Sequence, residues 1–390
     1  MGKRAAIIVL DGVGIGAASD AAAYGDAGSD TLGHVMARMT PEKLENLGEA
    51  GLGNIRSING LPPSTAPVAA FGFMSPSSAG KDSTTGHWEI AGVRVEVPFP
   101  TYPAGFPTSL IDEFAARTGR SVIGNVVGSG TDVIARFGEE HVRTGAWIVY
   151  TSADSVFQVA AHEGIVSLPE LYAGCETARA ILVPPNDVSR VIARPFIGEV
   201  GSFRRTANRR DFSVVPPSET LLDALATAGI ERNGVGKVDD LFAGRSISSQ
   251  HTAGNAEGIQ LIQRWLSSGA DTGFLFANLV DFDQLYGHRN DVPGFFGALR
   301  EFDAALPTLR RALREEDLLF ITADHGNDPT TASSDHAREN VPVLALGPAV
   351  RAGSNIGHRA TFADLGATIA AWFGLSFRGA GTSFLAQIVR

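Results

Sequence analysis

The chain has 390 residues, of which 44% are hydrophobic and 19% charged, as in an ordinary folded enzyme, and this length exceeds what one hydrophobic core usually organises, so we expect two domains. The formal net charge of −10 argues against a nucleic-acid partner, because such partners require a basic surface. The single cysteine, Cys175, excludes intramolecular disulfides and cysteine-rich zinc sites and favours a reducing, cytoplasmic location.

The first predicted element is a strand over residues 5–10, which is short, apolar and rich in β-branched side chains. It stops at Asp11 and is too short for a signal peptide. No other stretch approaches the length of a transmembrane helix, so we expect no membrane association. The glycines at 12, 14 and 16 do not follow the order of a dinucleotide-binding loop, and Asp11 would repel a pyrophosphate. We therefore interpret Asp11 as a candidate metal ligand at the end of a buried parallel strand.

Residues 57–80 are rich in proline, serine, alanine and glycine, which predicts long surface loops. They lead to three consecutive hydroxyl side chains, Ser83, Thr84 and Thr85, before a predicted helix. A helix N-terminus stabilises anions through its free N–H groups and its dipole, so a nucleophilic hydroxyl there would meet a stabilised phosphate. Helix capping is the commoner use of such residues. The pattern alone does not select one hydroxyl.

The character of the sequence changes between about residue 97 and residue 216. Prolines crowd the entry to this segment, and Pro216-Pro217 marks its exit. Within it, strands are predicted over 146–150 and 191–193 and a helix over 168–180. We predict an inserted α+β domain over residues 98–215, joined by proline-marked hinges. Its arginines at 190, 194, 204, 205, 209 and 210 are either solvated or, on a domain that covers a metal site, suited to bind phosphate through forked hydrogen bonds.

After Pro217 the alternation of strands and helices resumes. Helices are predicted over 218–228, with Ser218 as the cap, and over 255–268, 293–314 and 361–374, the last opening with a capping box from Thr361 to Asp364. Buried strands are predicted over 273–280 and 318–322. Residues 1–97 and 216–390 are therefore expected to form one discontinuous core domain of the α/β class.

Carboxylate and imidazole side chains recur just beyond three of these strands. In open α/β sheets that edge binds ligands, and such side chains suit hard-to-borderline cations such as Mn²⁺ or Zn²⁺. Each residue alone is also consistent with a turn-forming aspartate or a polar loop histidine. Together they supply ligands for two metals that could clamp a phosphoryl group in transfer. The set consists of Asp11, Asp283, His288, Asp324, His325 and His336.

Longer motifs resemble the alkaline phosphatase superfamily and, within it, the phosphopentomutase family, essentially from end to end. In the predicted core they are Val9-Leu10-Asp11-x-Val13-Gly14-Ile15-Gly16, Gly80-Lys81-Asp82-x-x-Thr85-Gly86-His87-Trp88-Glu89, Asn278-Leu279-Val280-Asp281-Phe282-Asp283 with Gly287-His288-Arg289, and Thr322-Ala323-Asp324-His325-Gly326-Asn327-Asp328-Pro329 with Asp335-His336. The insertion carries Tyr150-Thr151-Ser152-Ala153-Asp154-Ser155 and Val191-Ile192-Ala193-Arg194-Pro195-Phe196. Asp-His-Gly is common to the superfamily, whereas the motif from Lys81 to Glu89 is far more specific.

The resemblance implies an alkaline-phosphatase-like core, mainly a parallel sheet flanked by helices, with residues 98–215 as a cap. It makes Thr85 the phosphorylated nucleophile. It assigns two metal ions, expected to be Mn²⁺ with other divalent cations possible, to two ligand sets: Asp11, Asp324 and His325, and Asp283, His288 and His336. The residues it places near the sugar or the distal phosphate are Ser152, Asp154, Arg190, Arg205 and Lys237.

The implied reaction interconverts the 1-phosphate and 5-phosphate of ribose or deoxyribose through a sugar bisphosphate, which also serves as activator. Two departures from the family pattern stand out: Gly12, where serine is expected in many relatives, and Ser83-Thr84, which add hydroxyls beside Thr85. Arg204 and Arg209 are close alternatives to Arg205. The alternative functions are a metal-dependent phosphatase, a phosphoglycerate-mutase-like enzyme of the same superfamily, and an inactive phosphosugar-binding protein. The complete ligand set argues against the last.

Overall fold

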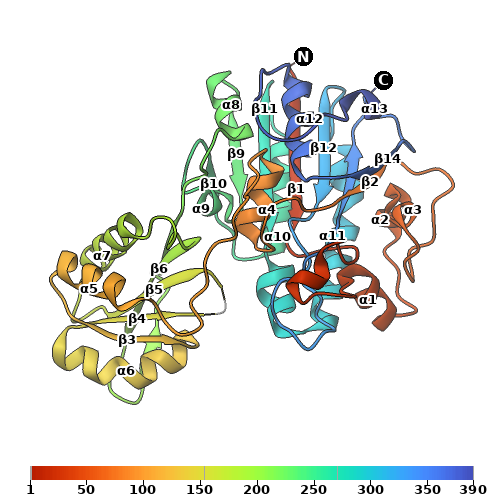
Figure 1. The fold of residues 1–390 in the computed structure, drawn as a ribbon. Coiled ribbons are helices and arrows are strands. Elements are labelled where there is room, and N and C mark those ends of the chain that lie inside the picture. The colour runs from red at the N-terminus through yellow and green to blue at the C-terminus, as the bar shows by residue number, and fades with distance from the viewer. Residues whose placement is uncertain (1, 153, 270, 390) are drawn as a thin grey trace. The chain divides into compact units, whose positions relative to one another are not determined.

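The structure is a computed structural model that describes residues 2–152, 154–269 and 271–389. The chain divides into two compact units, one formed by Met1–Val97 with Pro216–Arg390 and the other by Pro98–Val215. We call them the core unit and the inserted unit. Figure 1 shows the secondary structure of each.

The core unit is built on an eight-stranded sheet in the order β10-β9-β11-β1-β12-β13-β2-β14. Its central strands are parallel to one another and buried at every residue: β11 (Gly273–Leu279), β1 (Arg4–Leu10) and β12 (Asp317–Thr322). The outer strands are β9 (Arg232–Val235), β10 (Ser248–Gln250), β13 (Val341–Leu346), β2 (Ala70–Met74) and β14 (Asn355–Arg359). Because β13 runs antiparallel to both of its neighbours, the sheet is mainly but not wholly parallel.

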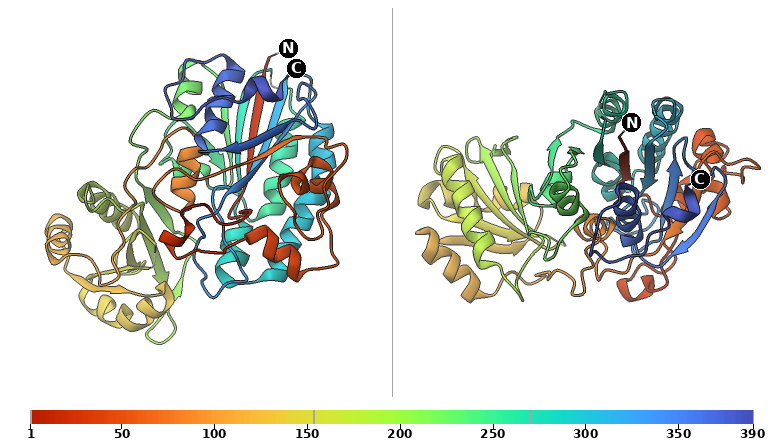
Figure 2. Two further views of the ribbon diagram at one scale, coloured as in Figure 1. Left: turned by 45° about the vertical axis from the view of Figure 1, so that its right-hand side comes forward. Right: turned by 90° about the horizontal axis from the view of Figure 1, so that it is seen from above.

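Helices cover both faces of this sheet, which is why its central strands read as continuous apolar runs (Figure 2). One layer contains α10 (Asn255–Leu266) and α11 (Val292–Arg311), and the other contains α4 (Ser83–Ile90), α8 (Leu221–Thr227) and α12 (Ala363–Phe373). The shorter helices are α1 (Thr31–Arg38), α2 (Glu45–Ala50), α3 (Leu52–Ile55), α9 (Val238–Leu241) and α13 (Leu385–Ile388). The predicted α/β fold is confirmed, with the buried strand boundaries shifted by one residue.

Two predicted helix caps are wrong. Helix α8 begins at Leu221, because Thr220 and Asp223 form a capping box and leave Ser218 outside the helix. Helix α12 begins at Ala363 without a capping box. Asp364 there binds the guanidinium of Arg359, and Thr361 donates its hydroxyl hydrogen bond to the carboxylate of Glu89.

The inserted unit is a second sheet with a helical layer on each face. Its strands follow the order β3-β4-β5-β6-β7, with β8 also paired to β6. They are β3 (Val122–Val127), β4 (Trp147–Thr151), β5 (Val156–His162), β6 (Arg190–Ile197), β7 (Arg204–Arg205) and β8 (Arg210–Ser213). Helices α5 (Thr108–Thr118) and α7 (Leu168–Ile181) bury one core, which includes Cys175, and α6 (Gly130–Thr144) buries a smaller one.

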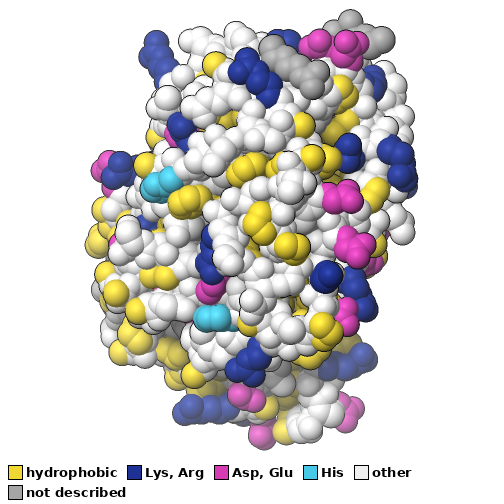
Figure 3. Space-filling view, turned by 90° about the vertical axis from the view of Figure 1, so that its right-hand side faces the viewer, with side chains coloured by type: hydrophobic (Ala, Val, Ile, Leu, Met, Phe, Trp, Pro, Cys, Tyr) yellow, Lys and Arg dark blue, Asp and Glu magenta, His cyan; other side chains and the backbone are white. Residues whose placement is uncertain are grey.

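No helix in the described ranges is both long and apolar enough to cross a membrane. On the face of the molecule shown in Figure 3, acidic and basic side chains are interspersed with small hydrophobic areas. Charge of both signs is therefore distributed over this face without one dominant patch.

A buried ion pair ties β1 to β12 at their N-terminal ends, where Arg4 pairs with Asp317. The Arg4 guanidinium is fully buried. It donates to both Asp317 oxygens, at 2.9 and 2.5 Å, and to the carbonyl oxygens of Trp265 and Leu266. The N–H groups of this buried cation therefore donate to one carboxylate and to carbonyl oxygens at the end of helix α10.

Asp317→Asn is expected to lower the free energy of unfolding by about 3–5 kcal/mol, because it leaves a buried guanidinium without its counter-charge. Urea denaturation followed by tryptophan fluorescence measures this loss. Glu113→Gln is the matched control, because Glu113 pairs with Arg117 on an exposed helix surface and should change stability by less than about 1 kcal/mol. Equal small losses in both variants would contradict the expectation.

Candidate active site

The predicted metal ligands follow the C-terminal ends of three adjacent strands. Strand β1 lies between β11 and β12 in parallel register, so the segments after all three strands emerge at one edge of the sheet. Asp11 directly follows β1, and Asp283 lies in the short helical turn η2 (Phe282–Tyr286) after β11. Asp324 and His325 come just after β12. His288 lies in the turn η3 (Gly287–Arg289).

Asp11, Asp324 and His325 form one compact group, whose ligand atoms lie within 4.8 Å of one another. The Nε2 atom of His325 is 3.2 Å from Asp11 Oδ1 and 3.5 Å from Asp324 Oδ2. Its Nδ1 atom is 3.0 Å from the carbonyl oxygen of Gly326, which suits a donor at Nδ1 and leaves Nε2 directed toward the carboxylates. This is the first ligand set implied by the resemblance.

Asp283, His325 and His336 form a second group under the same distance limit. Asp283 Oδ1 is 3.3 Å from His336 Nε2, and Asp283 Oδ2 is 3.1 Å from His288 Nε2. His288 Nδ1 lies 2.6 Å from the carbonyl oxygen of Ser334, so its other nitrogen is available to face Asp283. The structure therefore brings all six predicted ligands together, with His325 adjoining both groups.

The buried carboxylates carry a strong electrostatic cost. Burial, and after it the Asp324 carboxylate, raises the pKa of Asp11. Burial also opposes ionisation of Asp283, but His336 and His288 outweigh it and hold the pKa of Asp283 well below its usual range. Among the described residues, Asp324 Oδ2 and His336 Nε2 are buried and make no hydrogen bond, although they lie 3.1 Å from His87 Nδ1 and 3.3 Å from Asp283 Oδ1 respectively. Buried carboxylate oxygens and imidazole nitrogens that face one another in this way fit divalent cations.

Neighbouring side chains orient the ligands, and sequence reasoning had assigned them no role. Asn278 Nδ2 donates to Asp11 Oδ2 at 2.8 Å, and Asn327 Nδ2 donates to Asp283 Oδ1 at 2.6 Å. The ring of His87 is fully buried against Asp324, with 3.1 Å between His87 Nδ1 and Asp324 Oδ2. All three residues lie in the motifs that carry the family resemblance, but a motif does not show which atom each one contacts.

Two hydroxyls at the start of α4 adjoin this ligand set. Ser83 Oγ lies 3.1 Å from His325 Nε2 and 3.5 Å from Asp11 Oδ1. Thr85 is buried, and its hydroxyl donates to Asp82 Oδ2 at 2.6 Å, while its backbone N–H donates to Asp82 Oδ1. Thr85 also lines a small cavity together with Asp324 and His325. Ser83 therefore makes the direct contacts with the ligands, and Asp82 holds the Thr85 hydroxyl beside them.

The loop before α4 is fixed by two buried charges. Arg338 donates to the carbonyl oxygens of Ser78 and Gly80, at 2.6 and 2.5 Å, and forms an ion pair with Asp20. The Glu89 carboxylate accepts from the backbone N–H groups of residues 77 and 78. These contacts hold the loop in place and so position the start of helix α4, which carries the hydroxyl side chains.

The predicted substrate-binding residues belong to both units and are described within each. In the core unit, Lys237 precedes α9 and donates to Gln284 Oε1. In the inserted unit, Ser152 and Asp154 lie between β4 and β5, Arg190 opens β6, and Arg205 of β7 pairs with Phe196. The backbones of Arg190 and Arg205 thus lie toward opposite ends of β6.

Other charged residues lie with these arginines. The Asp211 carboxylate accepts two hydrogen bonds from Arg209, both at 2.7 Å, and lies 3.5 Å from Arg190 Nη1. Burial, helped by the charge of Arg209, lowers the pKa of Arg194 to about 10. The basic cluster of the inserted unit is therefore larger than the two arginines that the resemblance assigns.

Comparison with known proteins gives consistent results over the whole chain. The model of the Metalloenzyme superfamily matches residues 3–377. A phosphopentomutase of Caldanaerobacter subterraneus subsp. tengcongensis is 53% identical over 387 residues, covering 99% of this chain and 98% of that protein. One of Anaeromyxobacter sp. (strain K) is 53% identical over 392 residues, covering both chains completely.

Among solved structures, phosphoglycerate mutase of Leishmania mexicana aligns with a TM-score of 0.52 at 12% identity, covering 100% of this chain and 98% of that one. This likeness concerns the fold alone. The two phosphopentomutases match this chain over nearly its full length at 53% identity, which is enough to establish its family. The chain belongs to the Metalloenzyme superfamily and, within it, to the phosphopentomutases, which are isomerases.

Proposed function

We propose that this enzyme interconverts the 1-phosphate and 5-phosphate of ribose or deoxyribose through a phosphothreonine at Thr85 and a sugar bisphosphate. The observation that carries the proposal is the position of the α4 N-terminus beside two overlapping ligand groups. That arrangement suits phosphoryl transfer between a protein hydroxyl and a small phosphate ester. Sequence similarity to phosphopentomutases supports the choice of substrate.

The ligands would hold two Mn²⁺ ions, one at Asp11, Asp324 and His325 and the other at Asp283, His288 and His336. Bound cations at such a site stabilise the charge of the transferring phosphoryl group and lower the pKa of the attacking hydroxyl. Ser83 and Thr84 remain alternative nucleophiles, and we favour Thr85 because it occupies the position that the family motif assigns.

In the proposed first half-reaction, an oxygen of the sugar hydroxyl attacks the phosphorus of phosphothreonine. The bond from phosphorus to Thr85 Oγ1 breaks, the threonine oxygen takes up a proton, and the sugar becomes a bisphosphate. In the second half-reaction the other phosphoryl group returns to Thr85 and the isomerised monophosphate leaves. Asp82 is placed to hold the proton at Thr85 Oγ1 in the unphosphorylated enzyme, since their oxygens are 2.6 Å apart. A sugar bisphosphate is the expected activator because it can phosphorylate Thr85 in enzyme that carries no phosphoryl group.

The inserted unit is proposed to act as a cap that excludes water from phosphothreonine. Ser152 and Asp154 would orient the sugar hydroxyls, and Arg190, Arg205 and Lys237 would hold the phosphate that is not reacting. The size of the arginine cluster and the burial of Arg194 support phosphate binding by this unit. A phosphatase does not need a second phosphate-binding site, because its dephosphorylated product leaves after one transfer.

The experiment uses Mn²⁺-loaded enzyme, ribose 1-phosphate and a trace of ribose 1,5-bisphosphate, with products followed by phosphorus NMR. Ribose 5-phosphate without stoichiometric inorganic phosphate is the expected result. Release of inorganic phosphate in place of the isomer would assign a phosphatase. Conversion of 3-phosphoglycerate by the same enzyme, with ribose 1-phosphate unchanged, would assign a phosphoglycerate mutase.

Arg190→Ala is expected to lower isomerisation about 10- to 100-fold, because one charge-assisted contact to phosphate is lost, while hydrolysis of the phosphoenzyme changes much less. Parallel assays of isomer formation and of phosphate release measure the two rates. The control is Arg210→Ala, since the Arg210 guanidinium packs over the rings of Tyr172 and Phe212 in the same unit. Equal loss of both rates in Arg190→Ala would count against the assigned role.

A further inference from the structure

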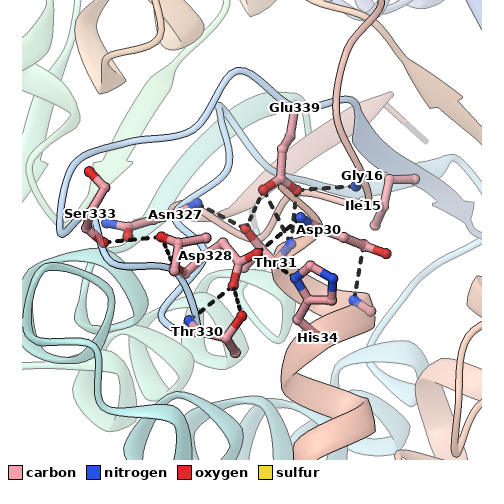
Figure 4. Close-up of polar contacts among 12 residues, drawn as sticks. Ile15, Gly16, Asp30, Thr31, His34, Asn327, Asp328, Thr330, Ser333 and Glu339 are labelled. Carbon is pink, nitrogen blue, oxygen red and sulfur yellow. Dashed lines mark hydrogen bonds and ion pairs between the residues drawn. The ribbon is translucent and has the colours of Figure 1, made fainter. Parts of the chain in front are cut away.

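Glu339 is a buried carboxylate close to the ligand groups but outside both of them. Its side chain is 1% exposed, and it takes part in none of the ion pairs found among the described residues. Its oxygens accept from the N–H of Thr31, at 3.0 and 3.2 Å, from the Thr31 hydroxyl at 2.8 Å, and from the N–H of Gly16 at 3.1 Å. These contacts surround the carboxylate in Figure 4. A carboxylate buried without a cation is costly, so its contacts need an explanation.

The contacts of Thr31 continue to a proposed metal ligand. The Thr31 hydroxyl oxygen donates to Glu339 and accepts from the N–H of Asn327 at 3.0 Å. The side chain of Asn327 then donates to Asp283 Oδ1 at 2.6 Å. An unbroken series of three hydrogen bonds thus joins Glu339 to Asp283.

A second contact ties the start of α1 to the same loop. Asp328 Oδ2 accepts from the N–H of Asp30 at 3.0 Å and lies 2.6 Å from His34 Nδ1. Figure 4 shows Asp30, Thr31 and His34 facing Asn327 and Asp328 across this junction. The first turn of α1 therefore supports the loop that follows His325 at two successive residues.

Three glycines provide the space for this arrangement. A Cβ atom at Gly14 would lie 2.3 Å from Glu339 Oε2, and one at Gly326 would lie 2.4 Å from Glu339 Cδ. At Gly287 a Cβ would be 2.6 Å from Asn327 Cγ. The Glu339 carboxylate and the Asn327 amide therefore occupy space that a side chain at these glycines would fill.

We propose that Glu339 is a positioning residue for the second metal ion, the one assigned to Asp283, His288 and His336. Glu339 holds the hydroxyl of Thr31, Thr31 holds the backbone of Asn327, and the Asn327 side chain orients the Asp283 carboxylate. This inference rests on the proposed metal centre. It assigns a role to a residue that belongs to neither ligand group but lines the same small cavity as Thr85, Asp324 and His325. Partners that orient a metal ligand typically change metal affinity about 10- to 100-fold when they are removed.

The test measures Mn²⁺ binding to metal-free protein by the electron paramagnetic resonance signal of unbound Mn²⁺. Glu339→Gln replaces one acceptor oxygen by a donor, and Thr31→Val removes the central hydroxyl while keeping the volume. Each substitution is expected to lower the affinity for the second Mn²⁺ about 10- to 100-fold. Thr31→Ser retains the hydroxyl and should bind both ions nearly as wild type does. The double variant of Glu339 and Thr31 should lose less than the sum of the single losses, because both act through one series of contacts.

Asp303→Asn is the matched control. Asp303 is also a buried carboxylate that accepts from the first N–H groups of a helix, at Leu47 and Asn46 of α2, but its contacts do not lead to the ligand loop. This variant should lose stability and keep both Mn²⁺ affinities.

Undiminished binding of the second Mn²⁺ by Thr31→Val would overturn the inference while leaving the proposed function intact. Equal weakening in Thr31→Ser and Thr31→Val would also overturn it, since the hydroxyl would then have no special role. If Glu339→Gln does not fold, the Thr31 pair decides the question. A wild-type protein that binds no Mn²⁺ would refute the proposed function, and the inference with it.

Discussion

Thr85→Ala is expected to abolish isomerisation of ribose 1-phosphate, with a loss of at least about 10⁴-fold, because it removes the hydroxyl proposed to carry the phosphoryl group between the half-reactions. Metal binding should be largely retained, since the Thr85 hydroxyl is held by Asp82 and not by a proposed ligand. Initial rates with saturating bisphosphate measure the loss, and Mn²⁺ titration of the same preparation checks the metal centre.

Ser83→Ala and Thr84→Ala are the controls for this experiment. Ser83 contacts His325 and Asp11, so its loss should lower the rate about 10-fold through a less well-held site, without removing turnover. Thr84→Ala should have a smaller effect. If Ser83→Ala were inactive and Thr85→Ala were active, Ser83 and not Thr85 would be the nucleophile.

Removal of the metals is expected to abolish activity and to lower the melting temperature together. Without cations the carboxylates of Asp11, Asp283 and Asp324 lie close together in a buried site. Cations that bind only the native state stabilise it by about 2.7 kcal/mol each when the free concentration is 100 times Kd. The gain should disappear in acid as protons compete for the histidines. Chelation followed by calorimetry and an activity assay measures both effects, and added Mn²⁺ should restore them.

His336→Ala removes a proposed ligand of the second metal ion, so it should lower both activity and melting temperature, as metal removal does. His251→Ala is its control, because His251 joins Asp239 and Asp240 in another group of possible ligands, which is more exposed and follows the outer strands β9 and β10 instead of the three central strands. Chelation that changes neither activity nor melting temperature would refute the two-metal account.

The main features of the core and its site were accessible from sequence because they depend on local patterns. Apolar runs mark β1, β11 and β12, and the residues that follow buried parallel strands must meet at one sheet edge. That rule brought Asp11, Asp283 and Asp324 together without any knowledge of the rest of the fold. Of the histidines, His325 lies directly beyond the end of β12, whereas His288 and His336 lie farther along the segments that follow β11 and β12.

Contacts between distant segments were not accessible in this way. Glu339 and Thr31 are 308 residues apart, and nothing in either local pattern distinguishes them from ordinary loop and helix residues. The wrong cap at Ser218 has a local cause: Ser218 and Thr220 both offer a hydroxyl, and the capping box of Thr220 with Asp223, three residues further on, decides between them. Sequence patterns show which side chains are available, but they do not show which distant partner satisfies them.

The most direct test of the account is the fate of one phosphoryl group. Enzyme loaded with Mn²⁺ is labelled by ribose 1,5-bisphosphate that carries ³²P, the label is located by peptide mapping, and the washed protein is then mixed with unlabelled ribose 5-phosphate. The account predicts label on Thr85 that passes to the sugar as bisphosphate and then appears in both monophosphates. Label on Ser83 or Thr84, or its quantitative release as inorganic phosphate, would contradict the account.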